Sequence, residues 1–218
     1  MARIETEEHV APSGWGWNVH LVKLPSGGLF VYSPAWLGDD TFARIERHGT
    51  PEVLFAPNSV HHVSLEKFRA RWPRALACAS KGALPRLSKH GHPGLRDAAE
   101  APLPDGARLL SAEGVDNGET ILSVGGEWIF CDAYINFQRR ITGFPGFALR
   151  RLKIGHGLGI GGLFKMFVVK DRAAYKRWLF AELDRAPPAT VHFSHGAPIG
   201  GPEVAARLKN LANERLPT

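Results

Sequence analysis

The segment Val53-Leu-Phe-Ala-Pro-Asn-Ser-Val-His-His62 decides how the fold is predicted. Val53 to Ala56 is a short apolar run bounded by prolines, which is typical of a buried strand. The polar residues after Pro57 indicate a loop. Because neighbours on a strand point to opposite faces, His61 and His62 can both ligate one ion only from such an irregular loop. The segment therefore predicts a buried strand that ends in a loop suited to metal binding.

The residues before this segment predict strands and a short helix. Gly14 to Tyr32 has the apolar runs of paired strands joined at a Pro and Gly turn. Asp40 is a fair cap for a helix that Gly49 ends, and Ser64 is expected to cap another helix after the histidine loop. Strand, helix and strand in this order predict a βαβ unit with a parallel pair.

Two later strands end in further candidate ligands. Thr120 to Cys131, with its turn at Gly125-Gly126, is the clearest hairpin in the chain, and Asp132 follows it directly. His195-Gly196 lies two residues past the predicted strand Val191 to Phe193. Ligands gather at the carboxyl ends of strands in α/β sheets, and imidazoles with a carboxylate suit zinc, iron or nickel. These residues are therefore candidates for a divalent metal site, and packed histidines without a metal are the alternative. The predicted ligands are His61, His62, Asp132 and His195.

The remaining segments predict α/β layers in a single domain, residues 1–218. Asp171 should cap a helix that runs through Leu183, and Pro202 should stand at the start of a last helix. Lys81 to Pro104 is rich in Lys, Arg, Pro, Gly and His and is expected to be mostly loop. Strands interleaved with helices favour α/β layers over an all-β or bundle fold.

Composition limits the class of protein. The net charge of +6 is compatible with an anionic small-molecule substrate, an acidic membrane surface or nucleic acid, and does not choose among them. No apolar run approaches the ~20 residues that span a bilayer, and the polar, acidic stretch Met1 to His9 does not resemble a secretory signal. The expectation is a soluble, cytoplasmic protein. Cys78 and Cys131 are far apart and are expected to be reduced, partly buried thiols.

The stretch from residue 138 to 170 is basic, aromatic and rich in glycine. We interpret it as a lid-like insertion, with a cap over an anionic substrate or a patch for an acidic membrane as alternatives. Gly157 to Gly162 matches G-x-G-x-x-G, but no clear strand precedes it, so a flexible loop is expected rather than a nucleotide site. No nucleic-acid reader motif is present, and no nucleic-acid partner is expected.

The order of these features resembles the metallo-β-lactamase fold over nearly the whole chain. Paired strands, a helix, a strand, a histidine loop, a hairpin that ends in Asp132 and a late strand followed by His195-Gly196 occur in the family's order. The resemblance is closest to an uncharacterised branch with a Pro-Asn-x-x-His-His loop. It implies a four-layer αβ/βα sandwich of two mixed sheets flanked by helices.

The family motif His-x-His-x-Asp-His is degraded in this chain. Pro57 and Ser59 stand where its first two histidines belong, His61 stands in place of the aspartate, and His62 matches the last histidine. Asp132 matches the metal-bridging aspartate and His195 the final histidine. The family's middle Gly-His motif should lie near residues 112–114, where no histidine is present.

The resemblance therefore implies that half of a two-metal site is lost. It implies a metal-dependent hydrolase-like protein with at most one divalent metal, zinc before iron or nickel, at His61, His62, Asp132 and His195. Asp132 would be its catalytic residue, and the substrate an ester, lactone or phosphodiester. Four protein ligands would close a tetrahedral site. The alternative is a catalytically inactive binding or scaffold protein that holds an anionic ligand or a membrane surface through residues 138–170.

Overall fold

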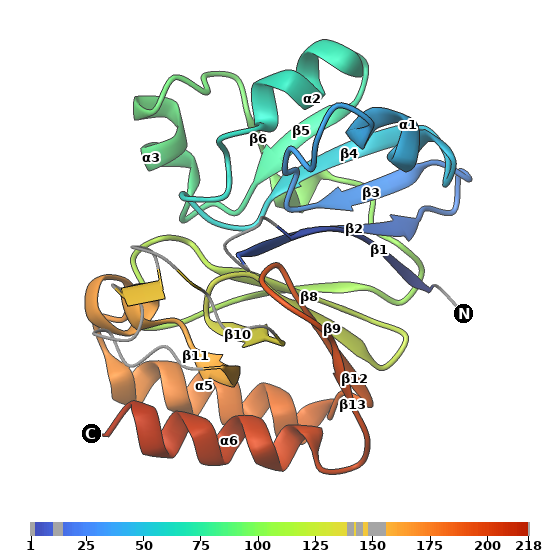
Figure 1. The fold of residues 1–218 in the computed structure, drawn as a ribbon. Coiled ribbons are helices and arrows are strands. Elements are labelled where there is room, and N and C mark those ends of the chain that lie inside the picture. Colours follow the sequence, from blue (N-terminus) through green and yellow to red (C-terminus); the bar gives the residue numbers. More distant parts are fainter. Residues whose placement is uncertain (1–2, 11–14, 139–141, 143–145, 148–155, 218) are drawn as a thin grey trace.

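Two mixed β-sheets pack face to face, with helices on both outer sides (Figure 1). The computed structural model describes residues 3–10, 15–138, 142, 146–147 and 156–217. Helices α1 to α3 lie on one outer side, and α5 and α6 on the other (Figure 1). The predicted four-layer αβ/βα sandwich is confirmed.

The first sheet has six strands in chain order, β1 to β6. The first three are antiparallel, and the pairs from β3 onward are parallel, which confirms the predicted βαβ unit. Its strands are β1 (Ile4–Val10), β2 (Gly16–Lys23), β3 (Leu29–Tyr32), β4 (Pro51–Ala56), β5 (Leu76–Ala79) and β6 (Arg96–Asp97). The helices that cover it are α1 (Thr41–Glu46), α2 (Leu65–Arg71) and α3 (Leu84–Lys89).

The second sheet has five strands in the order β13-β12-β9-β8-β7. The predicted hairpin is confirmed as β8 and β9, and β12 joins β9 in parallel. Its strands are β7 (Arg108–Ser111), β8 (Thr120–Val124), β9 (Glu127–Phe130), β12 (Thr190–Phe193) and β13 (Ile199–Gly200), and α5 (Arg172–Arg185) and α6 (Val204–Arg215) cover it. A separate two-stranded ribbon is formed by β10 (Tyr134–Phe137) and β11 (Gly157–Ile160).

Alternating side chains of the buried strands generate these layers. In β3, Leu29 and Val31 face the helices, while Phe30 and Tyr32 face the second sheet. In β9, Trp128 and Phe130 pack under α5 and α6, while Ile129 packs between the sheets. Because successive side chains point to opposite faces, a strand that is apolar at every position needs a packed layer on each side.

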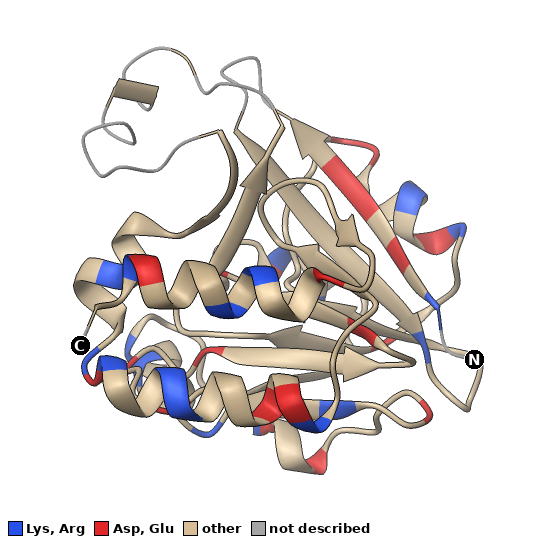
Figure 2. Ribbon diagram, turned by 90° about the horizontal axis from the view of Figure 1, so that it is seen from below, with Lys and Arg blue, Asp and Glu red and all other residues tan. Residues whose placement is uncertain are grey.

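The long helices follow the pattern predicted for them. Asp171 caps α5, where its Oδ1 accepts a hydrogen bond from the Ala174 N–H at 2.9 Å. Tyr175, Trp178 and Leu179 are buried against the second sheet. Figure 2, which looks onto α5 and α6, shows Lys, Arg, Asp and Glu interspersed along both helices. Their apolar stripes therefore face the sheet and their charges face water.

Three local predictions need correction. The stretch expected to be mostly loop, Lys81 to Pro104, contains α3, β6 and a 3-10 helix at Ala98–Glu100. Neither Asp40 nor Ser64 makes a side-chain cap; the Ser64 Oγ accepts instead from the Trp36 N–H at 2.9 Å. Gly157 to Ile160, expected to be a flexible loop, is strand β11, because its backbone pairs with β10.

Much of the expected lid-like insertion lies outside the described residues. Residues 139–141, 143–145 and 148–155 are not described, so the lid stays a prediction. The described remainder, from residue 156, forms β11 and a π-helix at Phe164–Val168. Among the described helices, none combines the length and apolar character that crossing a membrane requires.

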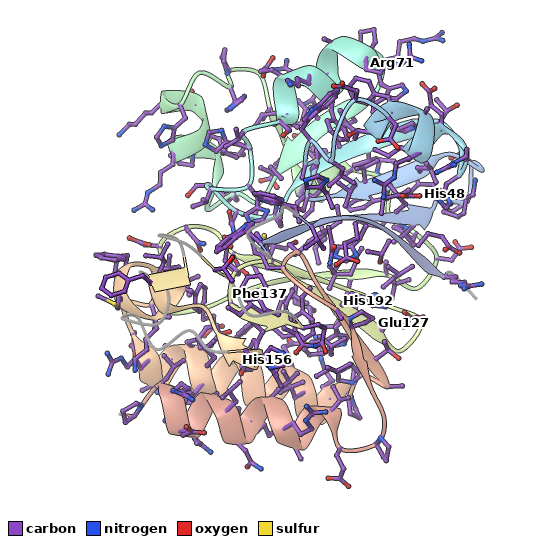
Figure 3. The ribbon with its side chains drawn as sticks, in the orientation of Figure 1. His48, Arg71, Glu127, Phe137, His156 and His192 are labelled. Carbon is purple, nitrogen blue, oxygen red and sulfur yellow. The ribbon has the colours of Figure 1, made fainter. Side chains whose placement is uncertain are left out.

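A histidine without access to water lies where the two sheets meet. His20 on β2 has no exposed surface, and its ring is 5.8 Å from that of His192 on β12. His192 is itself hydrogen bonded to Glu127, which lies beside it in Figure 3. Burial, and after it the neighbouring His192, lower the pKa of His20 to about 3. His20 is therefore neutral in the folded chain.

Acid should destabilise the fold through His20. The unfolded chain takes up this proton near pH 6.5, whereas the folded chain resists it down to a pKa of about 3. Between these values the unfolded state binds more protons, so this contribution lowers the free energy of unfolding by about 1.4 kcal/mol per pH unit as the pH falls. Urea unfolding from pH 6.5 to 4.5 should show a shallower slope in His20→Gln. The slope of His156→Gln, at an exposed histidine, should match the wild type; an unchanged slope in His20→Gln would contradict the assignment.

Candidate metal centre

Three side chains meet at the carboxyl ends of parallel strands from both sheets. His61 lies in the loop after β4, Asp132 follows β9 and His195 follows β12. The His61 Nε2 is 3.1 Å from the Asp132 Oδ1, and the His195 Nε2 is 3.2 Å from the His61 Nε2 and 3.5 Å from the Asp132 Oδ1. The structure thus brings together three of the four predicted ligands.

The spacing of these atoms suits a metal ion. Ligands at 2.0–2.2 Å from a tetrahedral zinc are separated from one another by about 3.3–3.6 Å. The three distances between His61, Asp132 and His195 run from 3.1 to 3.5 Å. Two imidazoles and one carboxylate are also the donor set of known mononuclear centres. The residues present therefore fit one metal ion with three protein ligands.

The far nitrogen of each ring has a partner of its own. The His195 Nδ1 lies 2.9 Å from the Gly16 carbonyl oxygen, which can only accept, so this nitrogen carries a proton. The His61 Nδ1 lies 2.8 Å from the Ser33 Oγ. The backbone of Ser33 has a φ of 59°, a positive value that residues other than glycine rarely adopt. In this conformation its hydroxyl contacts the His61 ring. Such partners orient ligating imidazoles.

Asn58 holds the histidine loop to the carboxylates. Its Oδ1 accepts from the Val60 and His61 N–H groups at 2.8 and 2.9 Å, which turns the chain after β4. Its Nδ2 donates to the Asp132 Oδ2 and to the Glu119 Oε2, both at 2.7 Å. Asn58 is fully buried. One amide therefore sets the turn that carries His61 and occupies the oxygen of Asp132 that faces away from the histidines.

Glu119 holds the backbone of the same site. It is fully buried just before β8, and its Oε1 accepts from the Asp132 and Ala133 N–H groups at 2.8 and 3.0 Å. Its Oε2 accepts from Asn58 and, at 3.3 Å, from the Asn117 amide. Two of these four donors are backbone N–H groups of the turn after β9, so the Glu119 carboxylate anchors that turn.

The charges in this cluster are strongly coupled. Burial, and then the charge of Asp132, raise the pKa of Glu119 to about 7. Burial alone would raise the pKa of Asp132, but His61 and His195 outweigh it and hold that pKa well below its ordinary value. The charge of Asp132 likewise raises the pKa of His61 against the effect of burial. Asp132 is therefore the ionised acceptor that the two imidazoles face.

Two glycines allow the chain to approach the site closely. Gly196 has a φ of +107°, and a Cβ there would lie 2.0 Å from the Asn136 carbonyl oxygen. This contact belongs to a backbone link in which the Asn136 N–H donates to the His195 carbonyl at 2.9 Å. A Cβ on Gly161 would lie 2.6 Å from the Asp132 carbonyl oxygen. The His-Gly pair in the sequence thus reflects the close packing that places His195.

His62, the fourth predicted ligand, has different partners. Its Nδ1 is 2.7 Å from the His92 Nε2, and the His92 Nδ1 is 2.8 Å from the Glu66 Oε1. Its ring also stacks on that of His90 at 5.3 Å. In the described part of the chain, no hydrogen bond or ion pair joins His62 to His61, Asp132 or His195. His61 and His62 are adjacent in this loop but belong to two separate clusters of side chains.

Cys131 also lies within reach of the site. Its Sγ belongs to a group with His61 and Asp132 whose ligand atoms all lie within 4.8 Å of one another. Burial, and then the charges of Asp132 and Glu119, raise the pKa of this thiol well above its ordinary value. Cys131 is fully buried and does not belong to the pocket wall, whereas His195 does. His195 is the better third donor.

A pocket opens beside the three side chains. It has a volume of about 680 Å³, and Asp132, His61 and His195 lie in its wall. Trp15 and Phe137 form its aromatic border with the site, where the Trp15 ring lies 5.4 Å from that of His195 and 5.3 Å from that of Phe137. Phe137 is labelled in Figure 3. The open side of the cluster therefore faces a space large enough for a small molecule.

The structure superposes on known structures, whereas comparison of the sequence finds no relative. Comparison of the sequence with family models and with curated proteins gives no match. A metallo-β-lactamase from Pontibacter korlensis superposes with a TM-score of 0.63 at 11% identity, over 97% of this chain and 94% of that one. The metallo-β-lactamase FIM-1 from Pseudomonas aeruginosa, in its mono-zinc form, gives 0.61 at 11% identity over 100% and 93%. The chain therefore has the metallo-β-lactamase fold, as the resemblance implied.

The same fold also occurs in a protein of another class. A flavoprotein from Thermotoga maritima superposes with a TM-score of 0.57 at 14% identity, covering 97% of this chain and 61% of that one. At such identities the likeness concerns the fold, and function must be argued from the site.

The role of Asn58 generates a test of the site's construction. Asn58→Ala should lower the free energy of unfolding by about 2–5 kcal/mol, because it leaves two buried carboxylate oxygens without their shared donor and removes the turn. Urea denaturation measures this. Asn213→Ala, on the exposed face of α6, is the matched control and should change stability by less than ~0.5 kcal/mol. Equal, small effects at both positions would contradict the role given to Asn58.

Proposed function

We propose that this protein is a hydrolase that works with a single divalent metal held by His61, Asp132 and His195. The observation that carries the proposal is the meeting of three donor atoms, 3.1 to 3.5 Å apart, in the wall of a pocket. Zinc suits this donor set best, and iron or nickel would also fit it. The mononuclear state and the activity go beyond the fold likeness and rest on this geometry.

The loss of the other half of the family's site supports a single metal. Pro57 and Ser59 stand at the positions of the first two motif histidines, and residues 112–114 contain no histidine. Within the described part of the chain, the close groups of metal-ligating side chains share His61 and Asp132, with Cys131 or His195 as the third member. The two-metal clamp of the family therefore has no counterpart among these residues.

Three protein ligands leave a coordination position open. A zinc ion with such an open position lowers the pKa of a bound water to about 7, which makes a nucleophile available at neutral pH. His62 is hydrogen bonded to His92, so the proposed site has three protein ligands instead of the four predicted from the sequence, which would close it. The proposal therefore favours a catalytic over a structural centre.

The chain's own residues have separate roles in this proposal. Asp132 presents Oδ1 to the two histidines, and it is the one carboxylate among the described residues of the pocket wall, so it is also the proton acceptor. Asn58 and Glu119 fix its carboxylate and its backbone. Trp15 packs on His195 and screens it from water. Esters or lactones are the substrates proposed first, since phosphodiester cleavage gains most from two metals.

Metal content should distinguish His62 from two of the proposed ligands, Asp132 and His195. Protein purified without chelator and then incubated with zinc is expected to hold one ion per chain by elemental analysis. Asp132→Ala and His195→Ala should lose the ion, because two donors alone bind a metal weakly. His62→Ala should keep it, because the described contacts of that ring are with His90 and His92. Removal of the metal should abolish ester hydrolysis, and zinc should restore it.

Two results would change the conclusion. Loss of zinc in His62→Ala to the same extent as in His195→Ala would support the four-ligand site instead. If the wild type takes up no zinc, iron or nickel, the hydrolase proposal fails. The chain would then be better described as a binding or scaffold protein with this fold.

A further inference from the structure

The pocket beside the candidate metal centre is built mainly from apolar side chains. Two tryptophans at the start of β2 and one between β3 and α1 contribute to it, with Phe137 from β10 and apolar residues of and beside the π-helix. These residues are Trp15, Trp17, Trp36, Phe137, Leu163 and Phe167. Such a wall favours molecules that bury apolar surface.

The polar groups of the wall gather at the metal centre and the histidine loop. They are the side chains of His61, His62, Ser64, Asp132 and His195. Ser64 is occupied by the Trp36 N–H, and His62 by His92. No Lys or Arg belongs to the described part of the wall. The described wall therefore has its polar groups beside the metal centre, where the bond to be cleaved would lie. It has no Lys or Arg that could pair with an anionic group in another part of the ligand.

The mouth of the pocket leaves large apolar side chains in water. Val63 is 85% exposed, Phe167 59% and Leu163 56%. All three belong to the pocket wall, so their exposed surfaces lie together rather than scattered. Contiguous apolar surface of this kind marks a ligand site more often than isolated exposed residues do. Binding of an apolar ligand here is favourable because it removes the apolar surface of the pocket and that of the ligand from water.

We propose that the pocket binds the apolar acyl group of a carboxylic ester, with the ester carbonyl at His61, Asp132 and His195. This inference rests on the proposed function for its chemistry, but the binding itself does not. Each turnover consumes one water: its hydroxyl bonds to the acyl carbon, the bond from that carbon to the alcohol oxygen breaks, and the proton passes to the alcohol oxygen. The products are a carboxylic acid and an alcohol.

The length of the acyl chain provides the kinetic test. With zinc-loaded protein, kcat/KM for p-nitrophenyl esters should rise from acetate to octanoate by on the order of two- to fourfold per methylene, as expected for burying each one. The negatively charged phosphodiester bis-p-nitrophenyl phosphate should be a poor substrate. A flat or falling series from acetate to octanoate would overturn the inference.

Two neighbouring residues offer matched variants. Phe167→Gln changes a residue of the pocket wall and should reduce the octanoate-to-acetate ratio of kcat/KM several-fold. Met166 is similarly exposed, at 55%, but does not belong to the pocket wall, so Met166→Gln should keep the wild-type ratio. Equal ratios in the two variants would contradict the placement of the acyl group.

Binding without turnover separates this inference from the proposed function. Ethyl octanoate added to Asp132→Ala should change the tryptophan fluorescence, since Trp15, Trp17 and Trp36 line the pocket, whereas ethyl acetate should not at equal concentration. If the wild type binds ethyl octanoate through Phe167 but hydrolyses no ester, the hydrolase proposal fails and the acyl site stands. If zinc-dependent hydrolysis occurs but ethyl octanoate does not bind, the acyl site fails and the hydrolase proposal stands.

Discussion

The buried amide of Asn58, shared between two carboxylates, is the interaction on which the candidate site depends. Asp132 and Glu119 both approach its Nδ2 at 2.7 Å; Glu119 is fully buried, whereas the Asp132 side chain keeps 24% of its surface exposed in the pocket wall. Two negative charges in such a place repel one another unless donors lie between and around them. The amide supplies those donors, while its oxygen shapes the loop that carries His61. Sheet packing, loop conformation and ligand placement are thus coupled at one side chain.

Much of the fold could be predicted from the sequence because its buried strands are short runs in which apolar residues predominate. Val53 to Ala56 and the hairpin from Thr120 are bounded by prolines and glycines, so their type and order were clear. Segments such as Lys81 to Pro104 were missed because the helix α3 there buries little beyond Leu87 and has no side-chain cap. The strand β11, rich in glycine, exists through its pairing with β10 rather than through its own composition.

The candidate site could be predicted in outline but not in its supporting residues. His61, Asp132 and His195 follow strands, so sheet topology alone suggested that they meet. The separation of His61 from His62 depends on His90 and His92, which belong to the segment Lys81 to Pro104 that the sequence predicts to be mostly loop. Glu119 was within a strand-flanking stretch and gave no signal, since a buried carboxylate is recognised only by the donors that the fold brings to it. Asn58 is one of the polar residues after Pro57 that indicate a loop, whereas its bonds to the carboxylates involve residues 61 and 74 positions away.

The position of Asn58 also bears on how long the protein lasts. Asparagine followed by a small residue such as Ser59 is chemically labile: the next backbone nitrogen attacks the side-chain carbonyl, and the amide is lost as ammonia. Here the Ser59 N–H donates to the Asn117 carbonyl at 2.9 Å, and both the Oδ1 and the Nδ2 of Asn58 are hydrogen bonded. The attacking nitrogen is therefore directed away from the carbonyl carbon. Loss of this amide would place a third carboxylate beside Asp132 and Glu119, so the hydrogen bonds that hold the loop also oppose a covalent change that would add charge to the site.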